Sequence, residues 1–164
     1  GLIGEEPKGT PNNIFPYICQ VALGKIDKLE IFGNNWPTKD GTCNRDYIHI
    51  MDLAHAHRCT LNHLTNKNSQ FLNLNIGTGI STSVLELVET FIEVNSCKVN
   101  YVFGDRRLGD SGYVVADNEL ALRTIDWAPK KNIKDMCKDG WRYVSSLNKK
   151  IRKESKKTTL KSFL

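Results

Sequence analysis

Residues 40–54 read DGTCNRDYIHIMDLA, a sequence that predicts a loop, a strand and a helix in succession. The opening residues are polar and include a glycine. From Tyr47 the side chains alternate, with Ile48 and Ile50 on one face and residues 47, 49 and 51 on the other, as in a short strand. Asp52 is a good helix N-cap, and the apolar positions after it recur at helical spacing. We therefore expect the strand to end, and the helix to begin, at Asp52.

The same stretch places a fixed positive charge where the loop enters the strand. Arg45 stands at this junction and Tyr47 follows two residues later, an arrangement that suits an anionic ligand carrying a ring. A simple surface ion pair of Arg45 with Asp46 or Asp52 is the alternative, and it would be favoured for a lone arginine. The neighbouring sequence is needed to decide between the two interpretations.

Strands and helices are predicted to alternate through the rest of the chain, which indicates an α/β fold. Pro11 stands near the start of the first predicted helix and Gly24 follows its end, while Ser83 and Glu86 form a capping box ahead of the most regular helix. The other predicted elements are strands at 29–33, 71–76 and 99–103, a short helix capped by Asp117 and a last helix that includes residues 133–147.

The composition is that of an ordinary soluble domain or a large piece of one. The chain has 164 residues, of which 40% are hydrophobic and 25% charged. No apolar run is long enough to span a bilayer and no signal peptide is recognisable, so no membrane association is expected. The chain begins at Gly1 without an initiator methionine, which suggests a partial sequence.

The net charge of +5 is concentrated at the C-terminal end. Residues 149–164 contain seven Lys or Arg and one acid, which leaves 16 basic and 17 acidic residues in the rest of the chain. We therefore predict a domain over residues 1–148 and a basic, flexible tail over 149–164. The tail lacks interleaved aromatic residues, so nucleic-acid binding is not expected.

The cysteine and glycine patterns exclude two further classes of site. The five cysteines are odd in number and widely scattered, and they form no C-x-x-C pair, which favours a reducing, cytoplasmic location and predicts no metal site. The sequence at 77–79, Gly-Thr-Gly, resembles the start of a dinucleotide-binding loop. The third glycine position is Thr82, however, and no acid follows at the required spacing, so we reject it as a phosphate loop.

A second cationic loop supports an anionic ligand. Residues 106–110, RRLGD, follow the strand predicted at 99–103. The planar fork of an arginine can form two parallel bonds to a phosphate, while a carboxylate such as Asp110 can accept from sugar hydroxyls or orient an arginine. Asn12 and Asn13 could add donors at a helix start, although from helix propensity alone a role as caps only is the better interpretation. From the residues alone we predict binding of an anionic small molecule such as a phosphate ester.

Several of these segments, taken in order along residues 1–145, closely resemble the UDP-glucose 4-epimerase family, a group of extended short-chain dehydrogenases/reductases. The matching segments are 4–7 (GEEP), 11–18 (PNNIFPYI), 31–34 (IFGN), 37–49 (PTKDGTCNRDYIH), 51–54 (MDLA) and 106–110 (RRLGD), followed by Trp127 and Trp141. The resemblance implies an α/β fold that corresponds to the C-terminal, substrate-binding lobe of such an enzyme, without most of the N-terminal Rossmann domain.

The resemblance also implies which residues bind the substrate. They are Asn12, Asn13, Ile14, Ile31, Phe32, Arg45, Tyr47, Val84, Arg107, Asp110 and Val114. By analogy with the family, Asn13, Arg45 and Arg107 would hold the pyrophosphate of a UDP-sugar, and Ile31 and Phe32 would lie along the uracil, largely through main-chain bonds.

Three more of these positions, Tyr47, Val84 and Asp110, match residues that line the nucleotide-sugar pocket in the family. Val114 matches a position that faces the hexose. A small residue there leaves room for an N-acetyl group, so acceptance of UDP-N-acetylhexosamines is a hypothesis for the full-length enzyme.

The catalytic groups of the family have no counterpart here. The family's NAD-binding glycine-rich loop and its Tyr-x-x-x-Lys pair belong to the N-terminal half, and none of the five tyrosines in this chain has a lysine four residues later. The resemblance thus implies a homodimeric NAD-dependent parent enzyme of galactose metabolism, of which this chain supplies binding but no catalytic residue. The alternatives are another nucleotide-sugar dehydrogenase of this type, such as a 4,6-dehydratase or a uronate epimerase, and a non-catalytic nucleotide-sugar or anion-binding module.

Overall fold

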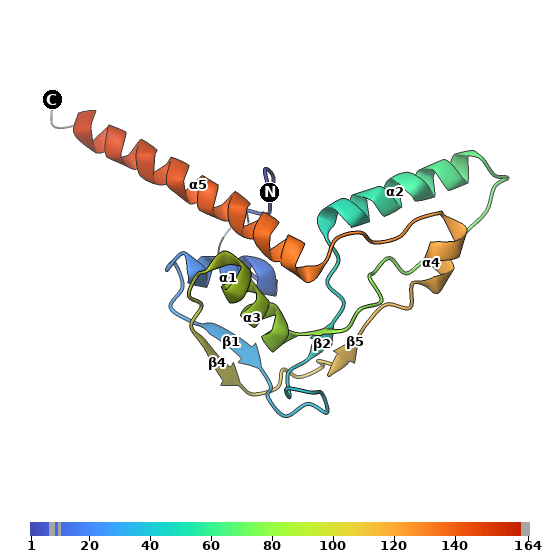
Figure 1. Cartoon of the computed structure of the whole chain (residues 1–164), viewed down its shortest axis with the longest axis horizontal. Helices are drawn as coiled ribbons and strands as arrows, with labels where there is room; N and C mark the ends of the chain where they lie inside the picture. The colour runs from blue at the N-terminus through green and yellow to red at the C-terminus, as the bar shows by residue number, and fades with distance from the viewer. Residues whose placement is uncertain (7–8, 10, 162–164) are drawn as a thin grey trace.

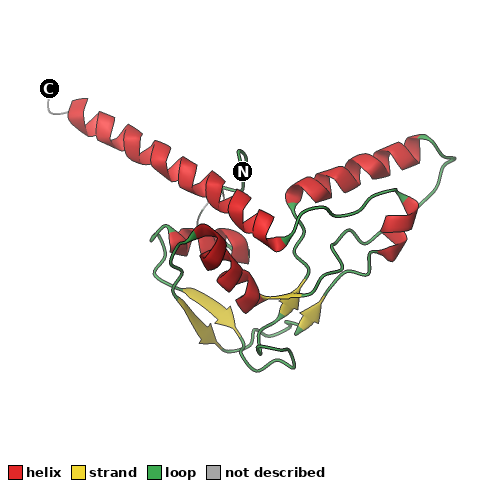
Figure 2. Cartoon of the chain, viewed as in Figure 1, coloured by secondary structure: helices red, strands yellow, loops and turns green. Residues whose placement is uncertain are grey.

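The fold is an α/β arrangement of five helices and two small sheets in the part of the chain that the structure describes (Figures 1 and 2). The computed structural model describes residues 1–161 except 7, 8 and 10, and of residues 150–161 only the backbone. Its elements in chain order are α1 (Ile14–Ala22), β1 (Leu29–Phe32), β2 (Asn44–Arg45), α2 (Ile50–Thr65), β3 (Thr82–Ser83), α3 (Val84–Asn95), β4 (Tyr101–Gly104), β5 (Tyr113–Val114), α4 (Glu119–Thr124) and α5 (Ile133–Lys161).

The larger hydrophobic core lies between helices α1, α3 and α5 and the β1–β4 pair, which run parallel with Phe32 opposite Gly104. Phe91 of α3 is fully buried, and its ring packs edge-on against both Phe15 and Trp141, with centroid distances of 5.8 and 5.7 Å. Aromatic pairs favour this geometry because the positive edge of one ring meets the negative face of the other. Figure 1 shows α5 crossing over α1 and α3.

A second, three-stranded sheet places β2 between β3 and β5. Asn44 and Arg45 of β2 pair antiparallel with β3 and parallel with β5. The capping box predicted at Ser83 is confirmed: its hydroxyl accepts from the Glu86 N–H at 2.9 Å, and the Glu86 carboxylate accepts in return from the Ser83 N–H. Because β3 runs directly into α3, this cap fixes the start of α3 beside β2.

The strand predicted over residues 47–51 and the N-cap at Asp52 are both wrong. Strand β2 ends at Arg45, and α2 begins at Ile50 with His49 as its N-cap, whose Nδ1 accepts from the Met51 N–H at 3.1 Å. The carboxylate of Asp52 instead accepts from the main-chain N–H groups of Lys130 and Lys131 at 3.0 and 2.8 Å. A tertiary contact has therefore replaced the local cap at Asp52.

Other boundaries also differ from expectation. Residues 71–76 form no strand, and the side chain of Phe71 is 85% exposed; a strand needs a partner edge, and no described segment of this chain supplies one. Helix α1 begins at Ile14 rather than at Pro11, and α4 has Asn118 rather than Asp117 as its N-cap.

The last helix runs across the boundary predicted at residue 148, since α5 continues from Ile133 to Lys161. The division into a domain and a tail at this point stays a prediction. None of the helices in the described part of the chain combines the length and apolar character needed to cross a bilayer.

Candidate functional site

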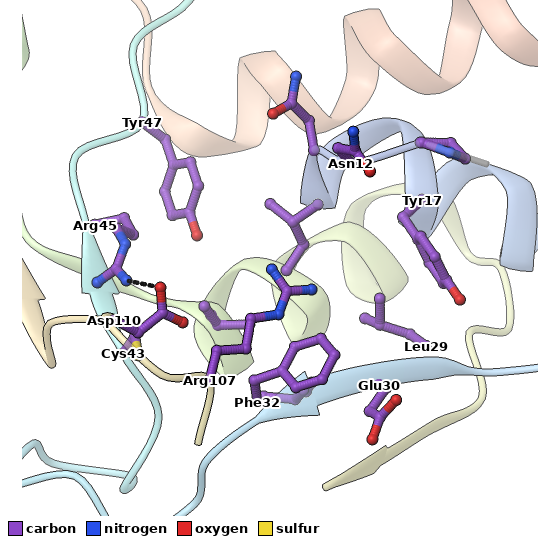
Figure 3. A pocket seen from close by; sticks show the side chains of 15 residues that line it. Asn12, Tyr17, Leu29, Glu30, Phe32, Cys43, Arg45, Tyr47, Arg107 and Asp110 are labelled. Carbon is purple, nitrogen blue, oxygen red and sulfur yellow. Dashed lines mark ion pairs between the residues drawn. The ribbon is translucent and has the colours of Figure 1, made fainter. Parts of the chain in front are cut away.

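A cavity of about 530 Å³ opens between the start of α1, strand β1, strand β2 and the loop after β4 (Figure 3). Ten of the eleven predicted substrate-binding residues line it: Asn12, Asn13, Ile14, Ile31, Phe32, Arg45, Tyr47, Val84, Arg107 and Asp110. The structure therefore brings together side chains that are separated by almost a hundred residues in the sequence.

Arg45 is held rigidly at one wall of the cavity. Its Nη1 donates to the main-chain carbonyls of Asn44 and Ser111, both at 2.8 Å, and its Nη2 lies 3.9 Å from the Asp110 carboxylate (Figure 3). The pairing with Asp110 fits the predicted role of a carboxylate that orients an arginine. With both Nη groups near oxygens, the guanidinium has a fixed direction before any ligand arrives.

Arg107 reaches the cavity from the loop after β4 and stacks on the aromatic ring of Phe32. Its Cζ atom lies 3.7 Å from the ring centroid (Figure 3). The preceding residue, Arg106, stacks on Trp36 at 4.0 Å, and it also donates through Nε and Nη2 to the side chain and carbonyl of Asn35. Of these two consecutive arginines, only Arg107 lines the cavity.

The start of α1 contributes donors at a third side of the cavity. Asn13 has the extended backbone of an N-cap residue, yet its side chain forms no cap hydrogen bond. The amide of Asn13 is thus not used for capping, although the sequence alone favoured that role. First-turn N–H groups of a helix carry partial positive charge and attract anions.

Tyr47 faces the cavity from the segment that follows β2 (Figure 3). Burial raises the pKa of its phenol to about 12, and the nearby charge of Arg45 only partly opposes this effect. The hydroxyl therefore remains a neutral donor over the physiological range. Val84, the first residue of α3, also lines the cavity, and its N–H donates to the Cys43 carbonyl at 2.9 Å, which fixes the start of α3 against the residue before β2.

Asp46 locks the segment between Arg45 and Tyr47 to the Gly77-Thr78-Gly79 loop. Its carboxylate accepts from the Thr78 N–H at 2.9 Å, the Thr78 hydroxyl at 2.5 Å and the Gly79 N–H at 2.9 Å. The N–H groups that a dinucleotide-binding loop would offer to a pyrophosphate are thus occupied by a carboxylate of the same chain. This loop does not fit the NAD diphosphate, in agreement with its rejection from the sequence.

Comparison with known proteins places the chain in a family. The family model described as GDP-mannose 4,6 dehydratase matches residues 4–140, most of the chain. The chain belongs to the GDP-mannose 4,6-dehydratase family. The relatives that it resembles include UDP-glucose 4-epimerases. Those of Bacillus subtilis and Drosophila melanogaster are 47% and 46% identical over 146 residues, covering 89% and 88% of this chain.

Solved structures of the family agree with this placement. The UDP-glucose 4-epimerase of Stenotrophomonas maltophila, with bound NAD and formylated UDP-arabinopyranose, is 41% identical, with a TM-score of 0.87 over 90% of this chain. That of Bifidobacterium longum, in complex with NAD+ and UDP, is 33% identical, with a TM-score of 0.83 over 88% of the chain. The predicted α/β fold of a nucleotide-sugar enzyme of this type is confirmed, and the chain spans about 43% of the length of the curated relatives it matches.

One predicted residue of the family pattern lies apart from the cavity. Val114, in β5, pairs with Arg45 in the sheet, but its side chain is 53% exposed and does not line the cavity. The hypothesis that it faces a hexose stays a prediction for the longer family members.

The cavity also has lining residues that the sequence reasoning missed. They are Pro11, Tyr17, Leu29, Glu30 and Cys43. The position of Tyr17 was open to prediction because it lies one helical turn after Asn13 and so shares its face of α1. No local signal marks Cys43, which is buried beside β2.

The described part of the chain contains no group of three His, Cys, Asp or Glu side chains that could hold a metal ion. All five cysteines are free thiols. The cavity offers a ligand two guanidiniums, a helix start, the carboxylates of Glu30 and Asp110 and the phenols of Tyr17 and Tyr47. This set of groups suits binding and orientation of a phosphorylated sugar.

Proposed function

We propose that this chain is the substrate-binding portion of a UDP-glucose 4-epimerase and that its cavity holds the UDP-sugar. The observation that carries the proposal is the convergence of Arg45, Arg107 and the Asn13 end of α1 on one cavity. These groups come from three elements and share one preference, for an anion with several oxygens.

The diphosphate would lie between the two arginines. A charge-assisted hydrogen bond contributes about 1.5–3 kcal/mol, and each guanidinium can form two such bonds in parallel. Arg45 is already oriented by the carbonyls of Asn44 and Ser111, so little of its freedom is lost on binding.

The two ends of the ligand would meet different groups. Strand β1 pairs with β4 along one edge and with no other described strand, which supports binding of the uracil by main-chain groups of Ile31 and Phe32. Tyr47 as donor and Asp110 as acceptor suit the hydroxyls of the sugar.

The proposed parent enzyme interconverts UDP-glucose and UDP-galactose through an NAD-dependent 4-keto intermediate, in galactose metabolism. The dinucleotide supplies the removal and return of hydride at the sugar C4. It would be held by residues outside this chain, as would the Tyr-x-x-x-Lys pair, and the proposed parent is a cytoplasmic homodimer. The chain itself would orient the sugar without reacting with it.

Calorimetric titration with UDP tests the binding proposal. Arg45→Gln and Arg107→Gln should each weaken UDP binding about tenfold or more, the loss expected when one charge-assisted contact is removed. Arg106→Gln is the matched control, because Arg106 donates to Asn35 outside the cavity, and its affinity should stay within about threefold. Equal losses in all three variants, or no UDP binding by the unmodified chain, would contradict the proposal.

The catalytic part of the proposal has its own test. The 164-residue chain should show no conversion of UDP-galactose with NAD present, and measurable turnover would overturn the assignment of chemistry to absent residues. Thermal shifts with UDP, dTDP and GDP would separate a uridine enzyme from dehydratases that use other bases, since the preferred nucleotide stabilises most at equal concentration.

A further inference from the structure

We propose that the Phe32 side chain is a positioning residue for Arg107, which it holds by its flat face so that the donor edge of the guanidinium points into the cavity. This inference rests on the proposed function, and it assigns the ring a task separate from any contact between the β1 backbone and a nucleobase.

Arg107 has no other partner in the described part of the chain. Its guanidinium forms no ion pair or hydrogen bond there, and the residue is exposed, yet its Cζ lies 3.7 Å from the centre of the half-buried Phe32 ring. Its loop turns sharply, with Gly109 at φ +85° and the Asp110 N–H donating to the Arg107 carbonyl at 3.2 Å. A long side chain in such a loop would otherwise sample many rotamers.

The geometry of the stack leaves the ligand-binding groups unoccupied. A cation–π contact uses the face of the guanidinium, whereas its five N–H donors lie in the plane and point outward. The ring therefore restricts the direction of Arg107 without using any donor. Restricting a group in its binding conformation increases affinity because less freedom is lost on binding.

The neighbouring arginine shows the opposite arrangement. Arg106 stacks on Trp36 at 4.0 Å, but its Nε and Nη2 already donate to Asn35. Its donor edge is thus satisfied within the protein, and it does not line the cavity. Two adjacent arginine–aromatic stacks therefore serve different purposes, one closing a loop and one presenting a free cation.

Inorganic pyrophosphate is the probe that isolates this role, because it has no base to contact Phe32. Titrations followed by ¹⁵N NMR should show pyrophosphate binding about two- to fivefold more weakly to Phe32→Leu than to the wild type, the loss expected for an exposed cation–π contact. Phe32→Trp keeps a ring and should bind at least as well as wild type. In an Arg107→Met background, Phe32→Leu should cause no further loss.

Trp36→Leu is the matched control, since it removes an aromatic partner of a non-cavity arginine and should leave pyrophosphate affinity unchanged. Thermal unfolding and the amide spectrum of each variant show whether it folds, and if Phe32→Leu does not, Phe32→Met takes its place. Binding of uridine is measured on the same variants.

The outcomes separate the two proposals. If the wild type binds neither pyrophosphate nor UDP, the proposed function fails. If it binds both, and Phe32→Leu binds pyrophosphate like wild type or weakens only uridine binding, the positioning role is overturned. The positioning role is also overturned if Phe32→Leu weakens pyrophosphate binding in the Arg107→Met background as much as it does in the wild type.

Discussion

Replacing Asp46 with asparagine should lower the free energy of unfolding and weaken UDP binding together, because this carboxylate ties the ligand-binding segment to two loops. Its Oδ1 accepts from the N–H and hydroxyl of Thr78, and its Oδ2 accepts from the N–H groups of Gly79 and Ala116 at 2.9 and 3.3 Å. The substitution keeps the shape of the side chain and changes one acceptor oxygen into a donor.

The size of the effect follows from these contacts. Asparagine retains one carbonyl oxygen, but its NH₂ group would face two N–H donors, so two hydrogen bonds to a charged group are lost. Each is worth about 1.5–3 kcal/mol. Asp46 is half-buried, so water can replace part of the loss, and we expect a net destabilisation of about 2–4 kcal/mol. Replacement of Asp46 by a smaller residue would also leave a cavity, which would add its own destabilisation to the loss of these hydrogen bonds.

Urea unfolding followed by far-UV circular dichroism measures the loss, with constant m-values required for the comparison. Asp117→Asn is the matched control: Asp117 is exposed and accepts a single bond, from the Glu119 N–H at 3.2 Å, so its effect should stay below about 0.5 kcal/mol. If the free energy of unfolding of Asp46→Asn lies within about 0.5 kcal/mol of the wild-type value, the Asp46 carboxylate does not hold the ligand-binding segment to the two loops as we infer.

Three further predictions concern titratable groups. Burial alone would raise the pKa of Asp40, but hydrogen bonds from Ser83 and Thr42 lower it below 3.8. The stability that the ionised Asp40 contributes is therefore present above pH 3.8 and should be lost as pH falls through the lowered pKa. Urea unfolding between neutral and acid pH should show that the free energy of unfolding falls less steeply with pH in Asp40→Asn. Burial raises the pKa of the Cys19 and Cys137 thiols to about 12, so both should resist alkylation at mildly alkaline pH until the protein unfolds, and fast native labelling seen by mass spectrometry would contradict this. Burial raises the pKa of Tyr47 to about 12, so an ultraviolet titration should show an ionisation step near pH 12 that Tyr47→Phe abolishes.

Local chemistry predicted several elements well. The capping box at Ser83 and Glu86 is a signal contained within four residues, and the structure forms it as expected. The strand at Leu29–Phe32 and the helix stop near Gly24, whose φ is +69°, are of the same kind. In each case the groups that satisfy one another are close in sequence, so pattern and structure agree.

The errors arose where a distant partner determined the local structure. Asp52 has the chemistry of an N-cap, yet the N–H groups of Lys130 and Lys131 bind its carboxylate, and His49 caps α2 instead. Residues 71–76 have the composition of a strand but find no partner edge in the described part of this chain. Neither outcome can be read from spacing alone, because both depend on what lies across the fold.

The candidate site combines both kinds of information. Residue type indicated an anion site at Arg45 and at Arg107, but only the family resemblance joined them, because nothing local relates loops so far apart in sequence. The structure supplies the physical link in the register of the β1–β4 pair. Phe32 lies opposite Gly104, so a loop residue three positions after Gly104 returns over the Phe32 ring. A slip of two residues in this register would move Arg107 by about 6–7 Å and break the stack, so the pairing of two short strands determines which arginine faces the cavity.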